Sequence, residues 1–443
     1  MNKRHYDNKV VRVTRVLSRF AIALLMTSAV YGAVNEADGP LLTESAAVAS
    51  ALRDNPGLAA MQLRYEALLE VPSQAGTLPD PVVNLNAMNF PTDSFDRSQE
   101  AMTQLQVGLT QMFPFPGKLG LKEEAASFDA TAAGFSVDEM RVQLAKNVKT
   151  TWWQIYYLDR ALETLEKNEN LARQFIAVAR TKYETGKGLQ QDILLAQLEL
   201  SKLMDQRLQL VALRRHQSIQ LNTLMDRPAP DGVSLADSAS LGMPGVLSEA
   251  ELYQVAVSAR PTLKAQETNI EAARSRLELA EMDQYPDFMV GVTYGDRSGD
   301  NPPYMGGSRA DLLSVMVGVQ IPLYSGRKQS RAISQREREL ARTRYALLDE
   351  KNLVRAAIAT SLTDYQTAKE QLELFGKGII PQAQQTVQSM LAAYQVSEVD
   401  FLNLVRSQMT LFNYELQYWK AFSEAKQALA RVEAAVGKET IYE

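Results

Sequence analysis

The sequence contains no cysteine and only two histidines among its 443 residues. The absence of cysteine excludes disulfide bonds, thiolate metal ligands and a lipid attached to an N-terminal cysteine. His5 lies in the extreme N-terminal segment, so His216 is the one histidine beyond it. We therefore expect no zinc or copper site built on imidazole and thiolate, and no cofactor.

Long uncharged runs are also scarce. The run Phe20–Tyr31 spans about 12 residues and follows a segment rich in lysine and arginine, whereas a membrane-spanning helix needs ~20 apolar residues. This order is typical of a secretory signal peptide, which we place at residues 1–32. No later charge-free run approaches ~18 apolar residues. If the mature protein spans a membrane, we therefore expect it to do so with β-strands.

Motifs for catalysis and nucleotide binding are missing. Lys187 follows Gly186, but no serine or threonine comes next and no glycine stands at the spacing of a phosphate-binding loop. The chain has a net charge of −5, and removal of the basic N-terminal segment makes the remainder more acidic. We therefore predict that the protein is not an enzyme and does not bind nucleic acid.

Aromatic residues cluster at Trp152, Trp153, Tyr156 and Tyr157. Such a cluster could stack on a ligand, but aromatic side chains within a long helix more often pack between helices. The 16 methionines are scattered, which favours gap-filling in the core over soft-metal ligation. We interpret both features as structural.

The sequence contains the same ordered set of short motifs twice. Matching short motifs recur in the same order at an offset of roughly 205 to 211 residues, which indicates an internal duplication. Asn55-Pro56 corresponds to Arg260-Pro261, Pro79-Asp80 to Pro286-Asp287, Gly117 to Gly326, and Tyr183 to Tyr394. We place the first repeat at residues 44–225, a linker rich in Pro, Gly, Ser and Asp at 226–247, and the second repeat at 248–436.

Each repeat predicts a helix, a β-hairpin and a long helical hairpin. Proline is absent between Gly117 and Arg227, so one helix can run from Lys118 to Thr185, about 100 Å at ~1.5 Å per residue. A rod of this length must pack lengthwise against other rods. In the second repeat the rod is expected over Arg327–Leu374, with a break at Gly376–Pro381.

The returning helix of the first repeat carries a coiled-coil seam. Apolar residues recur there in alternating steps of four and three, and Arg207, Arg214 and Gln217 interrupt them. The hairpin tips are expected near residues 186 and 397. The seam residues are Leu189, Ile193, Ala196, Leu200, Leu203, Leu210, Leu221 and Leu224.

The β-hairpins are expected at residues 82–112 and 287–323. Residues 313–321 alternate apolar and small or polar side chains over ~9 to 11 positions, the pattern of a transmembrane barrel strand. A small sheet of a soluble protein, with one face exposed to solvent, shows the same alternation. Four strands cannot close a barrel and lipid does not tolerate an open edge, so a membrane-inserted chain must assemble as two, three or four copies.

The duplicated order resembles the TolC-type outer-membrane efflux family over residues 44–436. The motifs that carry the resemblance are Asn55-Pro56, Pro79-Asp80-Pro81, Pro286-Asp287, Ile380-Pro381-Gln382-Ala383 and the tip segment from Tyr183 to Gln197. The resemblance implies an α+β membrane protein that forms a homotrimer. Each chain would add four strands to one transmembrane β-barrel and long helices to a coiled-coil tunnel.

The resemblance also implies a place and a function. The protein would lie in the outer membrane, in contact with its lipid, with a large periplasmic portion. It would act as a passive channel that docks on a periplasmic adaptor and an inner-membrane pump. The two separated hairpins argue against a structural or adhesive coiled coil, which would carry one barrel segment per chain.

The segment Gln111–Lys118 is similar to the cation and heavy-metal branch of this family, which works with resistance-nodulation-division pumps. This similarity implies export of heavy-metal cations. A channel for type I protein secretion, or for efflux of drugs and other organic compounds, stays open as the alternative.

The tip segments provide the candidate site residues. In the family, acids line the periplasmic aperture nine and twelve residues beyond the second tip tyrosine, where this sequence has Asn403 and Arg406. The same count in the first repeat reaches Asp192. We predict an aperture formed by Asp192, Glu398, Asp400, Asn403 and Arg406, held closed by Arg406 and Asp192 of neighbouring tips, unless Arg406 is a solvated surface residue. The residues expected to contact the adaptor are Gly186, Lys187, Gly188 and Ser397.

Overall fold

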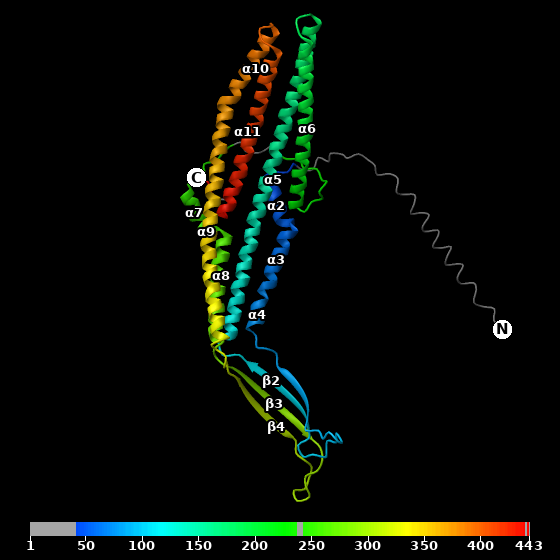
Figure 1. Ribbon diagram of the computed structural model, residues 1–443, viewed down its shortest axis with the longest axis vertical. Coiled ribbons are helices and arrows are strands. Elements are labelled where there is room, and N and C mark those ends of the chain that lie inside the picture. Colours follow the sequence, from blue (N-terminus) through cyan, green and yellow to red (C-terminus); the bar gives the residue numbers. More distant parts are fainter. Residues whose placement is uncertain (1–40, 237–241, 439–440, 443) are drawn as a thin grey trace, which may run out of the picture.

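The computed structural model describes residues 41–236, 242–438 and 441–442. The chain is elongated, with helices along most of its length and a single small sheet at one end (Figure 1). The predicted signal peptide at residues 1–32 lies outside the described residues.

The first half of the chain contains five helices and two strands in its described part. They are α2 (Glu44–Asp54), α3 (Pro56–Leu69), α4 (Val71–Gly76), β1 (Val82–Met88), β2 (Gln104–Phe113), α5 (Lys118–Glu184) and α6 (Gln190–Leu224). Helices α5 and α6 form a hairpin whose tip points away from the sheet (Figure 1).

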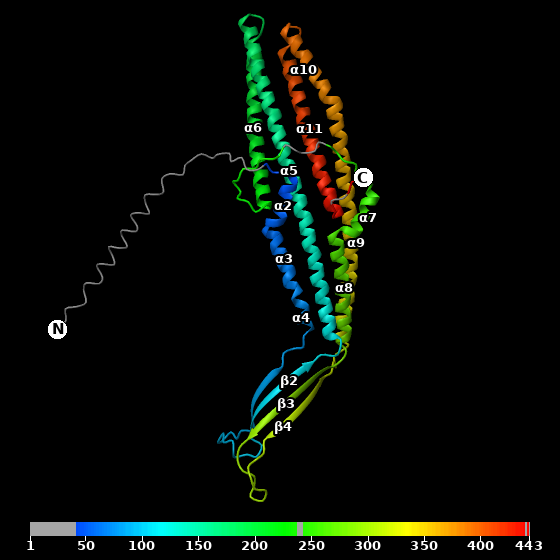
Figure 2. The ribbon, with the colours of Figure 1, turned by 180° about the vertical axis from the view of Figure 1, so that it is seen from behind.

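The second half repeats this order. It contains α7 (Glu249–Ala259), α8 (Pro261–Met282), β3 (Asp287–Arg297), β4 (Leu312–Gln320), α9 (Gln329–Leu374), the π-helical segment η1 (Phe375–Ile379), α10 (Ile380–Gln395) and α11 (Phe401–Val436). The second hairpin, from α9 to α11, lies beside the first in both views (Figures 1 and 2).

Helix α5 is the axis of the fold. It has 67 residues and ends at Glu184, one residue before the predicted limit. No proline interrupts its hydrogen bonds, so it continues for about 100 Å at ~1.5 Å per residue. It packs against α2, α3, α4, α6, α8 and α11, and the buried core therefore runs lengthwise rather than around a centre.

The seam of α6 is buried where it faces α5. Ala196, Leu203, Leu210 and Leu221 are all buried, as the alternating spacing predicted. Leu189 is 60% exposed instead, because it is the N-cap residue and precedes the first turn of α6. The seam therefore begins one turn later than predicted.

The two arginines that interrupt the seam form ion pairs between α5 and α6. Arg207 lies 3.1 Å from Glu169, whose side chain is buried. Arg214 lies 2.6 Å from Asp159 and also donates to the Val233 carbonyl oxygen. A buried charge that loses its partner is strongly destabilising, so the pair of Glu169 with Arg207 disfavours a shifted register of the two helices.

The predicted break in the second rod is a π-helical segment. Residues Phe375–Ile379 separate α9 from α10, and Pro381 lies in the first turn of α10. Proline lacks the backbone N–H that an uninterrupted α-helix would use, and π-helical turns accommodate such interruptions. The chain continues in the same direction through the segment rather than turning back (Figure 1).

The four strands form one antiparallel sheet in the order β1-β2-β3-β4. Local backbone geometry sets where two of the strands end. β1 ends at Met88 because Asn89 adopts a left-handed conformation with φ 54°. β4 ends at Gln320, short of the predicted 323, because Pro322 cannot donate to a strand partner.

The register places most of the large apolar side chains of the four strands on one face. Leu85, Val107, Tyr294 and Leu313 form one row across the sheet, and Val83, Leu109, Val292 and Val315 form the next. Asn84, Gly108, Thr293 and Ser314 lie between these rows on the opposite face. The alternation predicted along single strands thus becomes an apolar face of the whole sheet.

The aromatic cluster of α5 is part of the core. Trp152, Trp153 and Tyr156 are each at most 5% exposed and contact one another edge-on or stacked. Phe422 of α11 packs against Trp153, and the Trp152 indole donates to the Leu42 carbonyl oxygen at 3.0 Å. The structural interpretation of this cluster is confirmed.

Within the described ranges, the structure has no helix long and apolar enough to cross a membrane. The same residues include no group of three or more His, Cys, Asp or Glu placed to hold a metal ion.

Graded substitution of Trp152 tests the axial core. Trp152→Phe keeps most of the apolar volume but loses the hydrogen bond to Leu42, which should cost about 1 kcal/mol of unfolding free energy. Trp152→Ala also opens a cavity and should cost about 3 to 5 kcal/mol. Urea titration followed by helical circular dichroism measures both. Equal losses for the two variants would contradict the packing described here.

Candidate functional site at the hairpin tips

The two tips have the same turn although their sequences differ. Gly186 and Ser397 occupy equivalent positions with φ of 70° and 68°, in the left-handed region. At each tip this residue's N–H bonds the carbonyl three residues back, and the next N–H bonds the carbonyl five residues back. This is the Schellman geometry that glycine favours, so Ser397 adopts it at some conformational cost.

The predicted tip residues lie where an approaching protein could reach them. Gly186, Lys187 and Ser397 are exposed, and Gly188 is half-buried. Both tips form the end of the molecule opposite the sheet (Figures 1 and 2).

The five predicted aperture residues do not form one cluster within the chain. Glu398, Asp400, Asn403 and Arg406 are exposed at or near the second tip. Asp192 is 8% exposed and faces the second hairpin from α6. Among the described residues its side-chain partner is Tyr394, not Arg406.

A polar contact joins the two tips. The Tyr394 hydroxyl donates to Asp192 Oδ2 at 3.4 Å, and Tyr394 is 4% exposed. Lys182 Nζ lies 4.3 Å from the centroid of the Tyr394 ring, a cation–π distance. The same ammonium donates to the Tyr394 carbonyl oxygen and, at 3.0 Å, to Ser397 Oγ. Lys182 of the first hairpin thus contacts both Tyr394 and Ser397 in the tip of the second hairpin.

Apolar side chains pack against Tyr394 next to its contact with Asp192 and Lys182. Phe401 is 2% exposed, with its ring centroid 5.2 Å from that of Tyr394 and 6.4 Å from that of Phe175. Deeper between the hairpins, buried Gln408 donates to Asn168 Oδ1 at 2.8 Å. A buried hydrogen bond of this kind favours one register because any shift leaves polar atoms unpaired.

Sequence reasoning missed the roles of Lys182 and Tyr394. Tyr394 served only as a marker of the repeat, and Lys182 stands in no recognisable motif. The one available signal was that Tyr394 and Asp192 each lie close to a predicted hairpin tip. Spacing along the sequence does not show which side chains of the two hairpins face each other.

Burial of Tyr394 changes its acidity. Removal of the hydroxyl from water raises its pKa to about 12, and the negative charge of Asp192 and the hydrogen bond to it act in the same direction. The ordinary value is about 10. The docked tips therefore favour the neutral phenol, and this contribution to stability is present below pH 10 and lost as the pH rises through 12.

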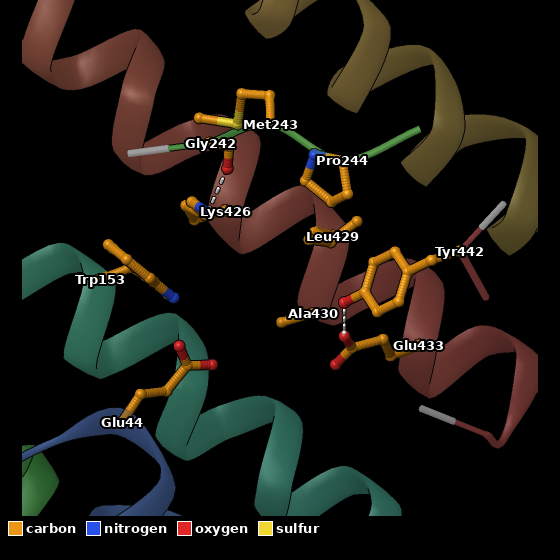
Figure 3. A pocket seen from close by; sticks show the side chains of 10 residues that line it. All are labelled: Glu44, Trp153, Gly242, Met243, Pro244, Lys426, Leu429, Ala430, Glu433 and Tyr442. Carbon is orange, nitrogen blue, oxygen red and sulfur yellow. Dashed lines mark hydrogen bonds between the residues drawn. The ribbon is translucent and has the colours of Figure 1, made fainter. Parts of the chain in front are cut away.

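A pocket of about 400 Å³ lies between α5 and α11, beside the chain segment at Met243 (Figure 3). Lys426 donates to the Gly242 carbonyl oxygen at 2.8 Å and lies 5.5 Å from the ring centroid of Trp153. Glu433 accepts from Lys149 and from the Tyr442 hydroxyl. Lys426 and Glu433 are thus paired within the protein, and they hold the inter-repeat segment and the C-terminal segment against the rods.

The known proteins that match this chain agree with its architecture. The family described as Outer membrane efflux protein matches residues 47–226 and 252–438, which is most of the chain. The chain belongs to the outer membrane efflux protein family. This is a family of channel proteins rather than of enzymes.

Individual members of the outer membrane efflux family share the fold at low sequence identity. The Outer membrane efflux protein BepC of Brucella suis is 23% identical over 340 residues, which cover 73% of each chain. The outer-membrane channel OprN superimposes with a TM-score of 0.76 over 89% of each chain at 16% identity. CusC superimposes with a TM-score of 0.73 over 89% of this chain and 92% of its own at 15% identity.

Titration of Tyr394 tests the tip contact of this efflux protein. The ultraviolet difference between the unmodified chain and Tyr394→Phe should show one phenol that ionises near pH 12. Asp192→Asn should lower that pKa toward the ordinary value, because the neighbouring negative charge is removed. A Tyr394 phenol that ionises near pH 10 in the unmodified chain would show that the tips are not docked in solution.

Proposed function

We propose that this protein is the outer-membrane channel subunit of a tripartite efflux system and that it works as a homotrimer. The observation that carries the proposal is the combination of a one-sided apolar sheet with rods of about 100 Å that leave it in one direction (Figure 2). The sheet would lie in the outer membrane and the rods would cross the periplasm.

The exposure of the sheet supports insertion into lipid. Leu85, Leu313 and Val317 are 75%, 72% and 69% exposed, all on the apolar face. Few soluble proteins leave an apolar face of this extent open to water. The outer edges of β1 and β4 have no strand partner among the described residues. Three copies would join these edges into twelve strands, above the minimum of about eight for a barrel.

The rods and tips support docking of partners. The exposed tip residues Gly186, Lys187 and Ser397 are proposed to contact a periplasmic adaptor protein, with Gly188 shaping the turn. Gly188 has no room for a side chain, because a Cβ there would lie 2.8 Å from Lys182 Cβ. The chain has no phosphate-binding loop, so the energy for export is proposed to come from an inner-membrane pump of the resistance-nodulation-division type.

For the cargo we propose heavy-metal cations. The support is the segment Gln111–Lys118, which joins β2 to α5 and carries the similarity to the cation branch. OprN and CusC superimpose over the same share of this chain, so fold similarity does not separate the cargoes. Protein secretion or efflux of organic compounds is the alternative for the same channel.

Two neighbouring substitutions on β4 test insertion. Val315→Arg places a charge on the apolar face, where arginine near the middle of a membrane costs roughly 2 to 4 kcal/mol. Ser314→Arg places the same charge at the same depth on the opposite face and should leave insertion nearly unchanged. The amount of trimer in isolated outer membranes measures both. Equal assembly would show that the apolar face does not meet lipid.

The tip contact suggests how the aperture is held. Asp192 is engaged by Tyr394 within the chain, whereas Arg406 and Asn403 are exposed and free to face a neighbouring subunit. In a trimer three copies of Arg406 would carry like charges close to the axis unless acids such as Glu398 or Asp400 pair with them. We therefore propose that the tips of the three subunits together close the aperture. In this closed state Arg406 would contact a carboxylate of the next tip.

Single-channel conductance in planar bilayers tests this closure. Asp192→Ala removes the acceptor of Tyr394 and Arg406→Ala removes the exposed charge, so each should give larger or more frequent openings. If both act on one closed state, the double variant should add little to either single variant. Conductance equal to that of the unmodified channel in all three variants would exclude a gating role for these residues.

A further inference from the structure

The junction between rod and sheet is held by a buried ion pair between the two repeats. Lys118, the first residue of α5, is 4% exposed, and its Nζ lies 2.8 Å from Asp287 Oδ1 at the start of β3. Asp287 also accepts from the backbone N–H of Phe115 at 2.8 Å. The Phe115 ring stacks on Tyr285 with centroids 4.7 Å apart. We call these four residues the junction clamp.

The duplication supplies a second set of the same residues. Asp80 follows Pro79 as Asp287 follows Pro286, and Arg327 follows Gly326 as Lys118 follows Gly117. One backbone hydrogen bond also corresponds: Lys118 N–H bonds the Phe115 carbonyl at 3.1 Å and Arg327 N–H bonds the Tyr324 carbonyl at 3.0 Å, although α9 itself begins later, at Gln329. Tyr324 is therefore the counterpart of Phe115.

Within one chain this second set is not assembled. Asp80 and Arg327 are exposed, and neither side chain makes an ion pair or hydrogen bond in the described part of the molecule. Tyr324 is 78% exposed and Leu78, the counterpart of Tyr285, is 42% exposed. By contrast, the junction clamp buries its lysine almost completely.

Sheet topology explains why the set stays apart. Asp80 precedes β1 and Arg327 follows β4, and these strands are the two opposite edges of the sheet. In the clamp, the corresponding residues flank β3 and β2, which are hydrogen-bonded neighbours. The second set can meet only if β4 of one copy lies beside β1 of the next.

We propose that Arg327 of one copy binds Asp80 of the next copy, with Tyr324 packed over Leu78, as an intersubunit version of the junction clamp. This inference rests on the proposed trimer and specifies its register. Clamps within and between chains then alternate around the ring at the level where rods meet strands. Arginine suits the intersubunit position because its planar guanidinium can hold a carboxylate in a bidentate pair.

Charge exchange tests the pairing. Asp80→Arg and Arg327→Asp should each lower the temperature at which half of the detergent-solubilised trimer dissociates, measured by native mass spectrometry. The double variant should recover at least half of the loss because the opposite charges face each other again. Lys328→Asp makes the same charge change one residue away and should lower the temperature by less than a third as much as Arg327→Asp.

The outcomes separate this inference from the proposed function. An unmodified chain that is monomeric would overturn the trimer and the pairing together. A stable trimer whose double variant is as weak as the sum of the single variants would overturn the pairing alone. Circular dichroism of each variant confirms that the helices are intact before dissociation is compared.

Cross-linking gives a second test that does not depend on charge. The chain has no cysteine, so Leu78→Cys with Tyr324→Cys introduces the only two thiols. Mild oxidation should produce covalent dimers and trimers on a denaturing gel. The matched control, Leu78→Cys with Tyr345→Cys, places the second thiol at another exposed tyrosine about four turns along α9 and should remain monomeric. Cross-linking that is equal in the two pairs, or absent from both, would overturn the register.

Discussion

The length of α5 is the constraint on which the rest of the structure depends. A helix of 67 residues cannot fold back on itself, so its apolar residues must be covered by other elements placed one after another along it. Short helices cover the half near the sheet, and the returning hairpins cover the half near the tips (Figure 1). The sheet and the tips are consequently held far apart, and each is free to serve a different contact.

Polar groups fix the register of this lengthwise packing. Leucine and alanine seams would tolerate a shift by one turn, since apolar contacts have little direction. Glu169 with Arg207, and Asn168 with Gln408, favour one register because a shift of the helices would separate these polar partners. The same principle recurs at both ends of α5, where Lys118 and Lys182 each reach across to the second repeat.

Patterns along the sequence predicted the rods, the four strands and the break near Pro381, because helix and strand periodicities are local properties. They did not predict that Asn89 ends β1, since its left-handed conformation depends on the loop that follows. At the candidate site, the structure pairs Asp192 with Tyr394 within one chain, and the contact of Asp192 with Arg406 between neighbouring tips stays a prediction. Spacing identifies equivalent turns of two hairpins, but only their relative rotation decides which side chains meet.

The one-sided sheet also has a consequence for biogenesis. A single newly exported chain would expose an apolar sheet face flanked by two edge strands whose backbone groups lack hydrogen-bond partners. This combination promotes association with any similar strand edge nearby. The helical rods can pack against one another in water, but the apolar face of the sheet stays exposed there. Escort by a holding chaperone, or delivery to the bilayer before the strands pair, would therefore matter to this architecture as much as the proposed trimer does.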